Sequence, residues 1–350
     1  MITMKDVAAA AKCSVMTVSL ALRDSREVSE TTKVRIKALC REMGYRPNPL
    51  VSALISQRKG PHGAETLALL SKFDEPIALW KKHEPFYSDL FKGINDRAEE
   101  LGFRVEEFPV WGKERISGER LTRILSTRGI RGVLLFPGGG LDRDFPELEW
   151  KNFAVVASAF HAKAMSVHRT ASNYGWAMEE SLLELERRGY RRIGLAMNSH
   201  LDPSTQFALS GRYLSWQIGL SAKSRVPLIK GTGARTTFDE FAAWVQQSKP
   251  DAILSLEVPV DTWLPRLGFS IPDDIGCAFL AIHGRTDVSG IDQRSYDVGR
   301  TTVTVLAREL FLNHYGLPEI PEVTLINGVW VEGNTTRPAH PAMPAALLSQ

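Results

Sequence analysis

The sequence predicts a small all-α head joined to a larger α/β body, whose two lobes are each built on a doubly wound parallel sheet. At 350 residues the chain is long enough for two or three hydrophobic cores. The first 45 residues hold three short helical segments, and from residue 66 onward apolar strand-like runs alternate with helical segments. With 43% hydrophobic and 24% charged residues, the composition is that of an ordinary globular protein.

Charge is distributed unevenly along the chain. Residues 1–60 hold 11 Lys and Arg against 5 Asp and Glu, a net charge of +6, whereas the remaining residues hold 32 against 35, a net charge of −3. A basic head on a mildly acidic body is typical of nucleic-acid binding. A solvated charged surface is the alternative interpretation.

The sequence offers no sign of export or of a membrane span. No run approaches the roughly 20 apolar residues that a span needs, and Lys5, Asp6 and Lys12 interrupt the segment where a secretory signal would have its apolar core. The cysteines are odd in number and have no metal-site spacing: Cys13, Cys40 and Cys277. We therefore expect a cytoplasmic protein with free thiols, no membrane partner, no metal and no cofactor.

Three helices are predicted in the head. Thr3 can cap a first helix over "MKDVAAAA", Ser14 caps a second over "VMTVSLAL", and Ser29 caps a third over residues 30–43 that Gly44 ends. Short helices with a tight turn between the first two are typical of a helix-turn-helix domain, whose second helix enters the major groove of DNA. A small helical bundle without a DNA role remains the alternative.

Apolar spacing gives the expected core of this head and a further helix after it. Val7, Val18 and Leu22 are expected in the core, and Val34, Leu39 and Met43 are expected on one face of the third helix. Beyond it, "PNP" at residues 47–49 can start a fourth short helix, which ends in the basic linker "QRKGPHG".

Four segments of the head carry a resemblance to a known family. They are "KDVAAAA", the pattern Ser14-x-x-"TVS", "VSETTKVRI" at residues 28–36 and "MGYRPN" at residues 43–48. With these matches at the correct spacing, the head resembles the DNA-binding domain of the lactose repressor (LacI/GalR) family of bacterial transcription regulators.

The resemblance implies which residues touch DNA. Val15, Met16 and Leu20 take the base-reading positions, where they offer only apolar contacts such as those to thymine methyl groups. The family often has Arg at the position of Leu20, so a different base preference is expected. The implied phosphate contacts, which fix register without reading sequence, are Ser14, Thr17, Ser19, Lys33, Tyr45 and Asn48. Core packing is the alternative role for Val15 and Met16.

In the hinge, the resemblance implies that Leu54 from each of two subunits inserts into the minor groove at the operator centre and bends the duplex. Ser52 stands where the family frequently has Arg. Two hinges that meet at one site require a homodimer on a roughly palindromic operator of double-stranded DNA. An ordinary apolar linker position is the alternative for Leu54.

The body alternates strands and helices. Strands are expected at "TLALLSKF", "VLLFPG", "FAVVAS", "RIGLAMN", "DAILSL", "IGCAFLAI" and "VTLINGVWV", and helices over residues 84–102, 174–188, 205–221, 238–248 and 296–314. The body also resembles the family's effector-binding region, which is similar to periplasmic sugar-binding proteins. The matches include "FYSDLFKGINDRAEELGFRVEEF" and "SGIDQRSYDVGR". In that architecture a ligand lies in the cleft between the lobes, beyond the carboxyl ends of the strands.

The expected division is a DNA-binding domain over residues 1–46, a hinge and linker over 47–64, an effector-binding and dimerisation body over 65–337, and a disordered tail over 338–350. Within the body, one lobe is expected to take residues 65–158 and 289–318. The other lobe is expected to take residues 159–288 and 319–337.

The resemblance implies effector contacts at Phe86, Tyr87, Asn173 and Arg212. Ser172 replaces the aspartate of the family's Asp-Asn pair, and the stretch 280–282, "LAI", stands where the family commonly has an aspartate near sugar hydroxyls. A sugar site needs both polar clamps and an apolar face, so an unusual ligand or a nearly silent pocket stays open beside a sugar or sugar-like effector. A solvated helix arginine is the alternative for Arg212.

The sequence therefore predicts a DNA-binding transcription regulator, most simply a repressor, that a small ligand modulates. An enzyme is not expected, because "FPGGGLDRD" lacks the Gly-Lys-Ser/Thr of a phosphate-binding loop and no nucleophile and base can be paired. A solute-binding module without DNA function is the second hypothesis.

Overall fold

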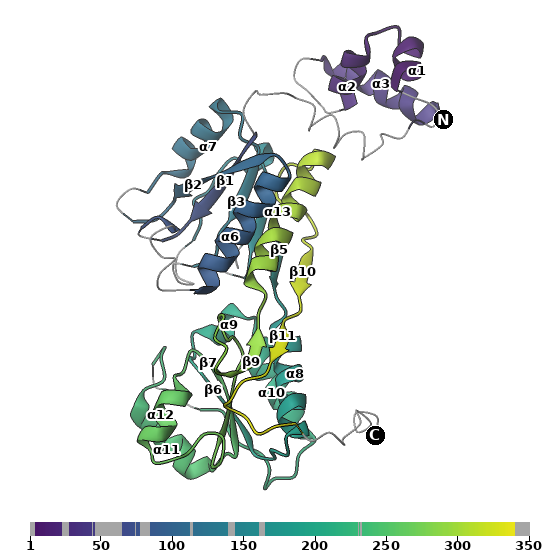
Figure 1. Cartoon of the computed structure of the whole chain (residues 1–350). Coiled ribbons are helices and arrows are strands. Elements are labelled where there is room, and N and C mark those ends of the chain that lie inside the picture. The colour runs from purple at the N-terminus through teal and green to yellow at the C-terminus, as the bar shows by residue number, and fades with distance from the viewer. Residues whose placement is uncertain are drawn as a thin grey trace.

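The computed structural model describes residues 4–22, 28–43, 45, 65–73, 75–77, 85–112, 115–138, 144–160, 165–229, 231 and 233–339. Figure 1 shows a three-helix head, coloured purple, and a body of two α/β lobes that follow one another along the long axis of the molecule. This arrangement confirms the fold class predicted from the sequence. The expected hinge helix and the expected tail from residue 340 onward lie outside the described residues.

The head consists of α1 (Met4–Ala10), α2 (Val15–Leu22) and α3 (Glu30–Glu42). The Ser14 hydroxyl accepts a hydrogen bond from the Thr17 amide at 3.0 Å, and Ser29 accepts one from the Thr32 amide, so each serine caps its helix as predicted. The three helices enclose a small core: Val7, Ala8, Ala11, Val18, Ala21, Val28, Ile36 and Cys40. Of the three apolar residues expected on one face of the third helix, Leu39 and Met43 pack against this core, whereas Val34 is 60% exposed.

The N-terminal lobe contains a six-stranded parallel sheet in the order β10-β5-β4-β3-β1-β2. Its strands are β1 (Glu65–Ser71), β2 (Phe103–Pro109), β3 (Gly132–Leu135), β4 (Ala154–Ser158), β5 (His168–Ser172) and β10 (Val323–Ile326). Helices α6 (Pro85–Glu100) and α13 (Ser295–Leu312) pack on one face and α7 (Gly118–Thr127) on the other. A 3-10 turn, η1 (Trp150–Asn152), precedes β4.

The C-terminal lobe contains a five-stranded sheet in the order β11-β9-β8-β7-β6. Its strands are β6 (Ile193–Met197), β7 (Ala252–Leu256), β8 (Gly276–Phe279), β9 (Ser289–Asp292) and β11 (Val329–Val331), of which only β11 runs antiparallel to its neighbour. Helices α8 (Tyr174–Arg187) and α10 (Ala208–Ile218) cover one face, and α11 (Phe238–Ser248) and α12 (Val260–Arg266) cover the other. The short helix α9 (Leu201–Ser204) precedes α10.

The lobe boundaries expected from the sequence were wrong at three strands. β5 and β10 pair with each other in the N-terminal sheet, although residues 159–288 and 319–337 were assigned to the other lobe. β9 pairs with β8 in the C-terminal sheet, although residues 289–318 were assigned to the N-terminal lobe. The chain therefore crosses between the lobes after β5, after β9 and after β10. The boundaries were wrong because the sheet that a strand joins is decided by the strands with which it forms hydrogen bonds.

The run "VTLINGVWV", expected as one strand, is divided between the two sheets. β10 ends at Ile326 and β11 begins at Val329. At the break, a Cβ atom on Gly328 would lie 2.6 Å from the carbonyl oxygen of Asp292, so only glycine permits this close approach of the two crossing segments. The crossing is also fastened by Asn173, whose amide donates to the Asn327 side-chain oxygen at 2.8 Å.

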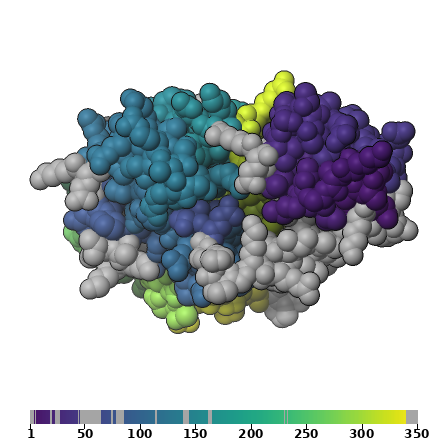
Figure 2. Space-filling model, turned by 90° about the horizontal axis from the view of Figure 1, so that it is seen from above, coloured from purple at the N-terminus to yellow at the C-terminus, as the bar shows by residue number. Residues whose placement is uncertain are grey.

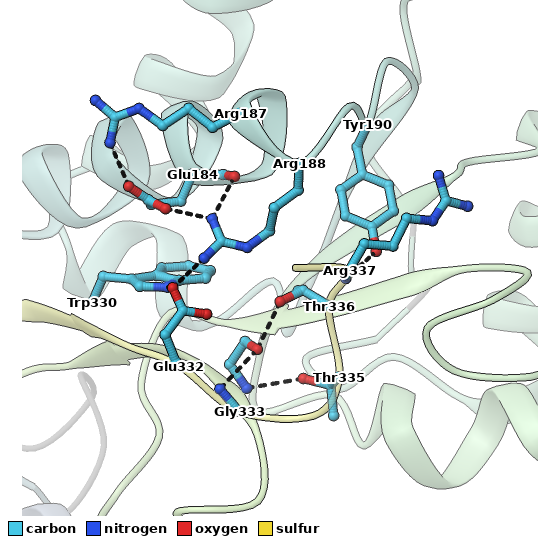
Figure 3. A network of polar contacts seen from close by, with 11 residues as sticks. Glu184, Arg187, Arg188, Tyr190, Trp330, Glu332, Gly333, Thr335, Thr336 and Arg337 are labelled. Carbon is cyan, nitrogen blue, oxygen red and sulfur yellow. Dashed lines mark hydrogen bonds and ion pairs between the residues drawn. The ribbon is translucent and has the colours of Figure 1, made fainter. Parts of the chain in front are cut away.

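A buried cation attaches α8 to the last strand (Figure 3). The Arg188 guanidinium has no exposed side-chain surface, forms ion pairs with Glu184 and Glu332, and lies 5.0 Å from the centre of the Trp330 ring. It also donates to the Glu184 carbonyl oxygen at 2.7 Å. These contacts hold the chain after β11 against the outer helices of the C-terminal lobe.

Candidate nucleic-acid interface and ligand cleft

The outer surface of the head presents the start of α2. Val18 and Ala21 are fully buried on the inner side of this helix, whereas Val15 is 41% exposed and Met16 is 64% exposed. Figure 1 shows the three helices of the head beyond the N-terminal lobe of the body, and Figure 2 shows the purple atoms of the head gathered on one side of the molecule. The second helix of the head therefore has one face in the core and an apolar first turn facing outward.

Leu20, the third predicted base-reading residue, lies in a different environment. Its side chain is partly buried and packs against the head core. Val15 and Met16 are thus brought together on the surface, and Leu20 is shared between the surface and the core.

The predicted phosphate contacts fall into separate groups. Ser14 is exposed, and its hydroxyl lies 2.9 Å from that of Thr17 at the start of α2. The Lys33 side chain is only 11% exposed, and its ammonium lies 3.1 Å from the Glu30 carboxylate. Tyr45 is partly buried, and this burial raises the pKa of its phenol. The Ser19 side chain, Asn48 and the hinge residue Leu54 lie outside the described part of the structure.

The structure adds a hydroxyl cluster that the sequence analysis did not select. The Ser29 hydroxyl at the start of α3 lies 3.1 Å from that of Thr31 and 2.8 Å from that of Thr32. The signal was present in the sequence, since both α2 and α3 begin with Ser-x-x-Thr. The hydroxyl groups at such a helix start can donate hydrogen bonds to phosphate oxygens, as can the backbone N–H groups beside them.

Comparison with known proteins identifies this head. The family model described as "Bacterial regulatory proteins, lacI family" matches residues 3–48. This match covers the head and does not extend into the body. Among curated relatives of this chain, the HTH-type transcriptional regulator CelR of Thermobifida fusca is 29% identical over 55% of this chain and 54% of its own length. The HTH-type transcriptional repressor CytR of Escherichia coli (strain K12) is 27% identical over 60% of this chain and 57% of its own length.

The alignments with CelR and CytR thus span a little over half the length of those relatives. Catabolite control protein A of Staphylococcus aureus (strain Mu50) aligns over 95% of this chain and 99% of its own length at 21% identity. Among solved structures, a CelR–cellobiose complex matches with a TM-score of 0.54 and 18% identity, covering 96% of this chain and 100% of that one. The lac repressor dimer bound to operator matches with a TM-score of 0.54 and 17% identity, covering 96% and 99%. These likenesses show the fold.

The predicted effector residues of the body are spread over three helices. Phe86 and Tyr87 begin α6, and their rings pack edge to face with centroids 5.1 Å apart. Asn173 accepts a hydrogen bond from the Trp176 amide at 3.1 Å, so it caps α8 besides linking the crossing segments. Arg212 on α10 forms an ion pair with Glu179 at 2.7 Å, and both side chains are about half exposed.

A polar group that the sequence analysis missed lies where the two lobes face each other. Asp89 on α6 of the N-terminal lobe is within electrostatic range of His283 and Asp292, which follow β8 and end β9 in the C-terminal lobe. Burial and the neighbouring Asp292 raise the pKa of Asp89, and burial lowers the pKa of His283 against the opposing influence of Glu257. Glu257, which follows β7, lies 3.6 Å from the His200 imidazole.

The position of these residues, not their spacing, is the signal that could have found them. Glu257 and His283 stand directly beyond strand ends, where ligands of such sheets bind. His283 also follows the "LAI" stretch at residues 280–282, so this chain places an imidazole and carboxylates where the two lobes face each other. Burial and Glu257 also raise the pKa of the Tyr174 phenol to about 12, which keeps it a neutral hydrogen-bond donor.

Two absences hold within the described part of the chain. None of its helices is both long and apolar enough to cross a membrane. None of its His, Cys, Asp and Glu side chains form a group of three or more that could hold a metal ion.

Proposed function

We propose that this protein is a sequence-specific DNA-binding transcription regulator, acting as a repressor, that binds a palindromic operator as a homodimer. The observation that carries the proposal is the first turn of α2. On a head that matches the LacI model over residues 3–48, it presents Val15 and Met16 outward from a helix capped by Ser14. In helix-turn-helix domains the N-terminal residues of the second helix contact base edges.

Phosphate contacts come from the hydroxyls at the two helix starts, together with Ser19, Lys33, Tyr45 and Asn48. Lys33 reaches a phosphate only by leaving its contact with Glu30 and extending from a site where its side chain is 11% exposed. Leu54 of each subunit inserts into the minor groove at the operator centre. The operative units are a head over residues 1–46, a hinge over 47–64 and a body over 65–337.

A small-molecule effector in the interlobe cleft modulates operator affinity by shifting the relative positions of the lobes. Phe86 and Tyr87 supply the apolar face of this site and Asn173 supplies a polar group. Arg212 joins the site only when it leaves Glu179. A sugar or sugar-like ligand is the first class to test, since the solved CelR structure holds cellobiose.

The deciding experiment is selection of bound sequences from random duplex DNA with the purified full-length protein. We expect enrichment of one palindrome, bound by a species with the mass of a dimer, and a change in its dissociation constant when the correct ligand is added. Enrichment of no sequence, either alone or with a metabolite extract, would reject operator binding. Ligand binding without any DNA binding would instead support a solute-binding module.

A further inference from the structure

The first turn of α2 lacks conventional hydrogen-bonding groups at its two outward-facing apolar positions. Val15 is 41% exposed and Met16 is 64% exposed. Valine carries no donor or acceptor, and the methionine thioether is only a weak acceptor. The Ser14 and Thr17 hydroxyls that flank them lie 2.9 Å apart at the helix cap, where the proposed function assigns them to phosphate oxygens and not to base edges.

Base edges in the major groove offer mostly hydrogen-bonding groups. Guanine presents two acceptors, cytosine a donor, adenine an acceptor and a donor, and thymine an acceptor together with its C5-methyl group. Among these features only the methyl group is favoured by an apolar side chain. A polar edge facing Val15 or Met16 would lose its water without gaining a partner, which is unfavourable.

We propose that Val15 and Met16 read the C5-methyl groups of pyrimidines, so that the chemical feature recognised at their positions is a methyl group and not a hydrogen-bond pattern. This inference rests on the proposed operator binding. It makes two positions of each half-site thymines, and it makes 5-methylcytosine a better ligand than cytosine at those positions. Leu20 contributes less, because its side chain is partly buried in the head core.

Replacing thymidine by deoxyuridine tests methyl reading directly, since the change removes the C5-methyl group and nothing else. With the selected operator and the full-length protein, each thymine of the half-site is replaced in turn, symmetrically in both halves, and binding is measured by fluorescence anisotropy. We expect the loss of each methyl group to lower the affinity about fourfold, so that a symmetric pair of replacements lowers it about sixteenfold. This loss is expected at only two positions of the half-site. Cytosine placed at either position should gain about the same factor when methylated.

Two variants connect the effect to the residues. Met16→Ala should reduce the thymine-to-deoxyuridine ratio to about one at a single position and leave the ratio at the other unchanged. Val34→Ala is the matched control, since Val34 is equally apolar and 60% exposed but lies on α3. It should leave both ratios unchanged, and far-UV circular dichroism should show both variants folded.

The outcomes separate this inference from the function on which it rests. An operator that binds equally well with thymine and deoxyuridine at every position would overturn methyl reading and leave operator binding intact. The same holds if Met16→Ala weakens binding without changing any ratio, or changes only the oligomeric state, as expected of a protein-docking surface. Failure to select any sequence would reject operator binding itself and methyl reading with it.

Discussion

Two neighbouring arginines on α8 differ mainly in burial. Arg187 and Arg188 both form ion pairs with Glu184, but the Arg187 side chain is 39% exposed and the Arg188 side chain is fully buried. Arg188→Met should lower the free energy of unfolding of the C-terminal lobe by about 3 kcal/mol, because it leaves Glu184, only 12% exposed, without its buried partner. The measurement is urea denaturation followed by circular dichroism.

Arg187→Met is the control, because it removes a cation that pairs with the same Glu184 carboxylate but is exposed to solvent. Its cost should stay below about 1 kcal/mol. Equal losses in the two variants would mean that charge alone, and not burial, gives Arg188 its role. Sequence alone could not have distinguished these arginines, since the Glu332 carboxylate that completes the site comes from a segment 144 residues away.

At the scale of elements, α6 and α13 form the closest helix contact of the N-terminal lobe. A Cβ atom on Gly299 of α13 would lie 2.2 Å from the Leu90 carbonyl oxygen, and one on Gly93 of α6 would lie 2.0 Å from the Tyr296 carbonyl oxygen. At their ends, Arg97 and Arg300 both pair with Glu100 and hold the pKa of its carboxyl to about 2. The two glycines therefore set the distance between the helices.

Gly299→Ala should destabilise the protein by about 2–3 kcal/mol, because the added methyl group meets backbone atoms that no rotamer change can move. Gly211→Ala in α10 is the matched control, since nothing lies within 4 Å of a Cβ atom there. That change should be neutral or stabilise the protein by about 0.5–1 kcal/mol through helix propensity. Thermal unfolding of the two variants measures both effects, and a neutral Gly299→Ala would show that the helices can separate without cost.

The sequence predicted these helices but not their contact. Apolar residues at spacings of three, four and seven indicated α6, because that spacing is a local property of one helix. The close approaches of Gly93 to Tyr296 and of Gly299 to Leu90 join residues about two hundred positions apart, and no local pattern records them. β2 escaped prediction for a related reason, since the edge strand "FRVEEFP" is charged and only one of its residues is buried.

For the molecule as a whole, sequence indicated two lobes but misplaced three crossing strands. An apolar run predicts a strand, but which sheet the strand joins depends on partners that are distant in sequence, as in the pairing of Val323 with Arg169. The candidate ligand site between the lobes was incompletely predicted for the same reason. Phe86 and Tyr87 could be predicted from the family pattern, whereas Asp89, His283 and Asp292 meet only once the lobes are assembled.

The hydrophobic clusters of the molecule predict that the body folds without the head. Every residue of the head cluster lies between Met4 and Tyr45, and no member of the four clusters of the body precedes Leu67. A unit with its own core folds alone, and removing a neighbour that shares none of that core should not lower its stability. A fragment of residues 65–350 should therefore unfold within about 2–4 °C of the main transition of the full chain, a shift of less than about 1 kcal/mol for a unit of this size.

The same fragment should show no operator binding, because it lacks Val15, Met16 and the hydroxyls at the helix starts. Differential scanning calorimetry gives the midpoint, and anisotropy with the selected operator gives the affinity. A midpoint more than about 10 °C lower would mean that the head contributes several kcal/mol to the body through contacts outside its own core. Persistent operator binding by the fragment would place the DNA-binding surface on the lobes instead of on α2.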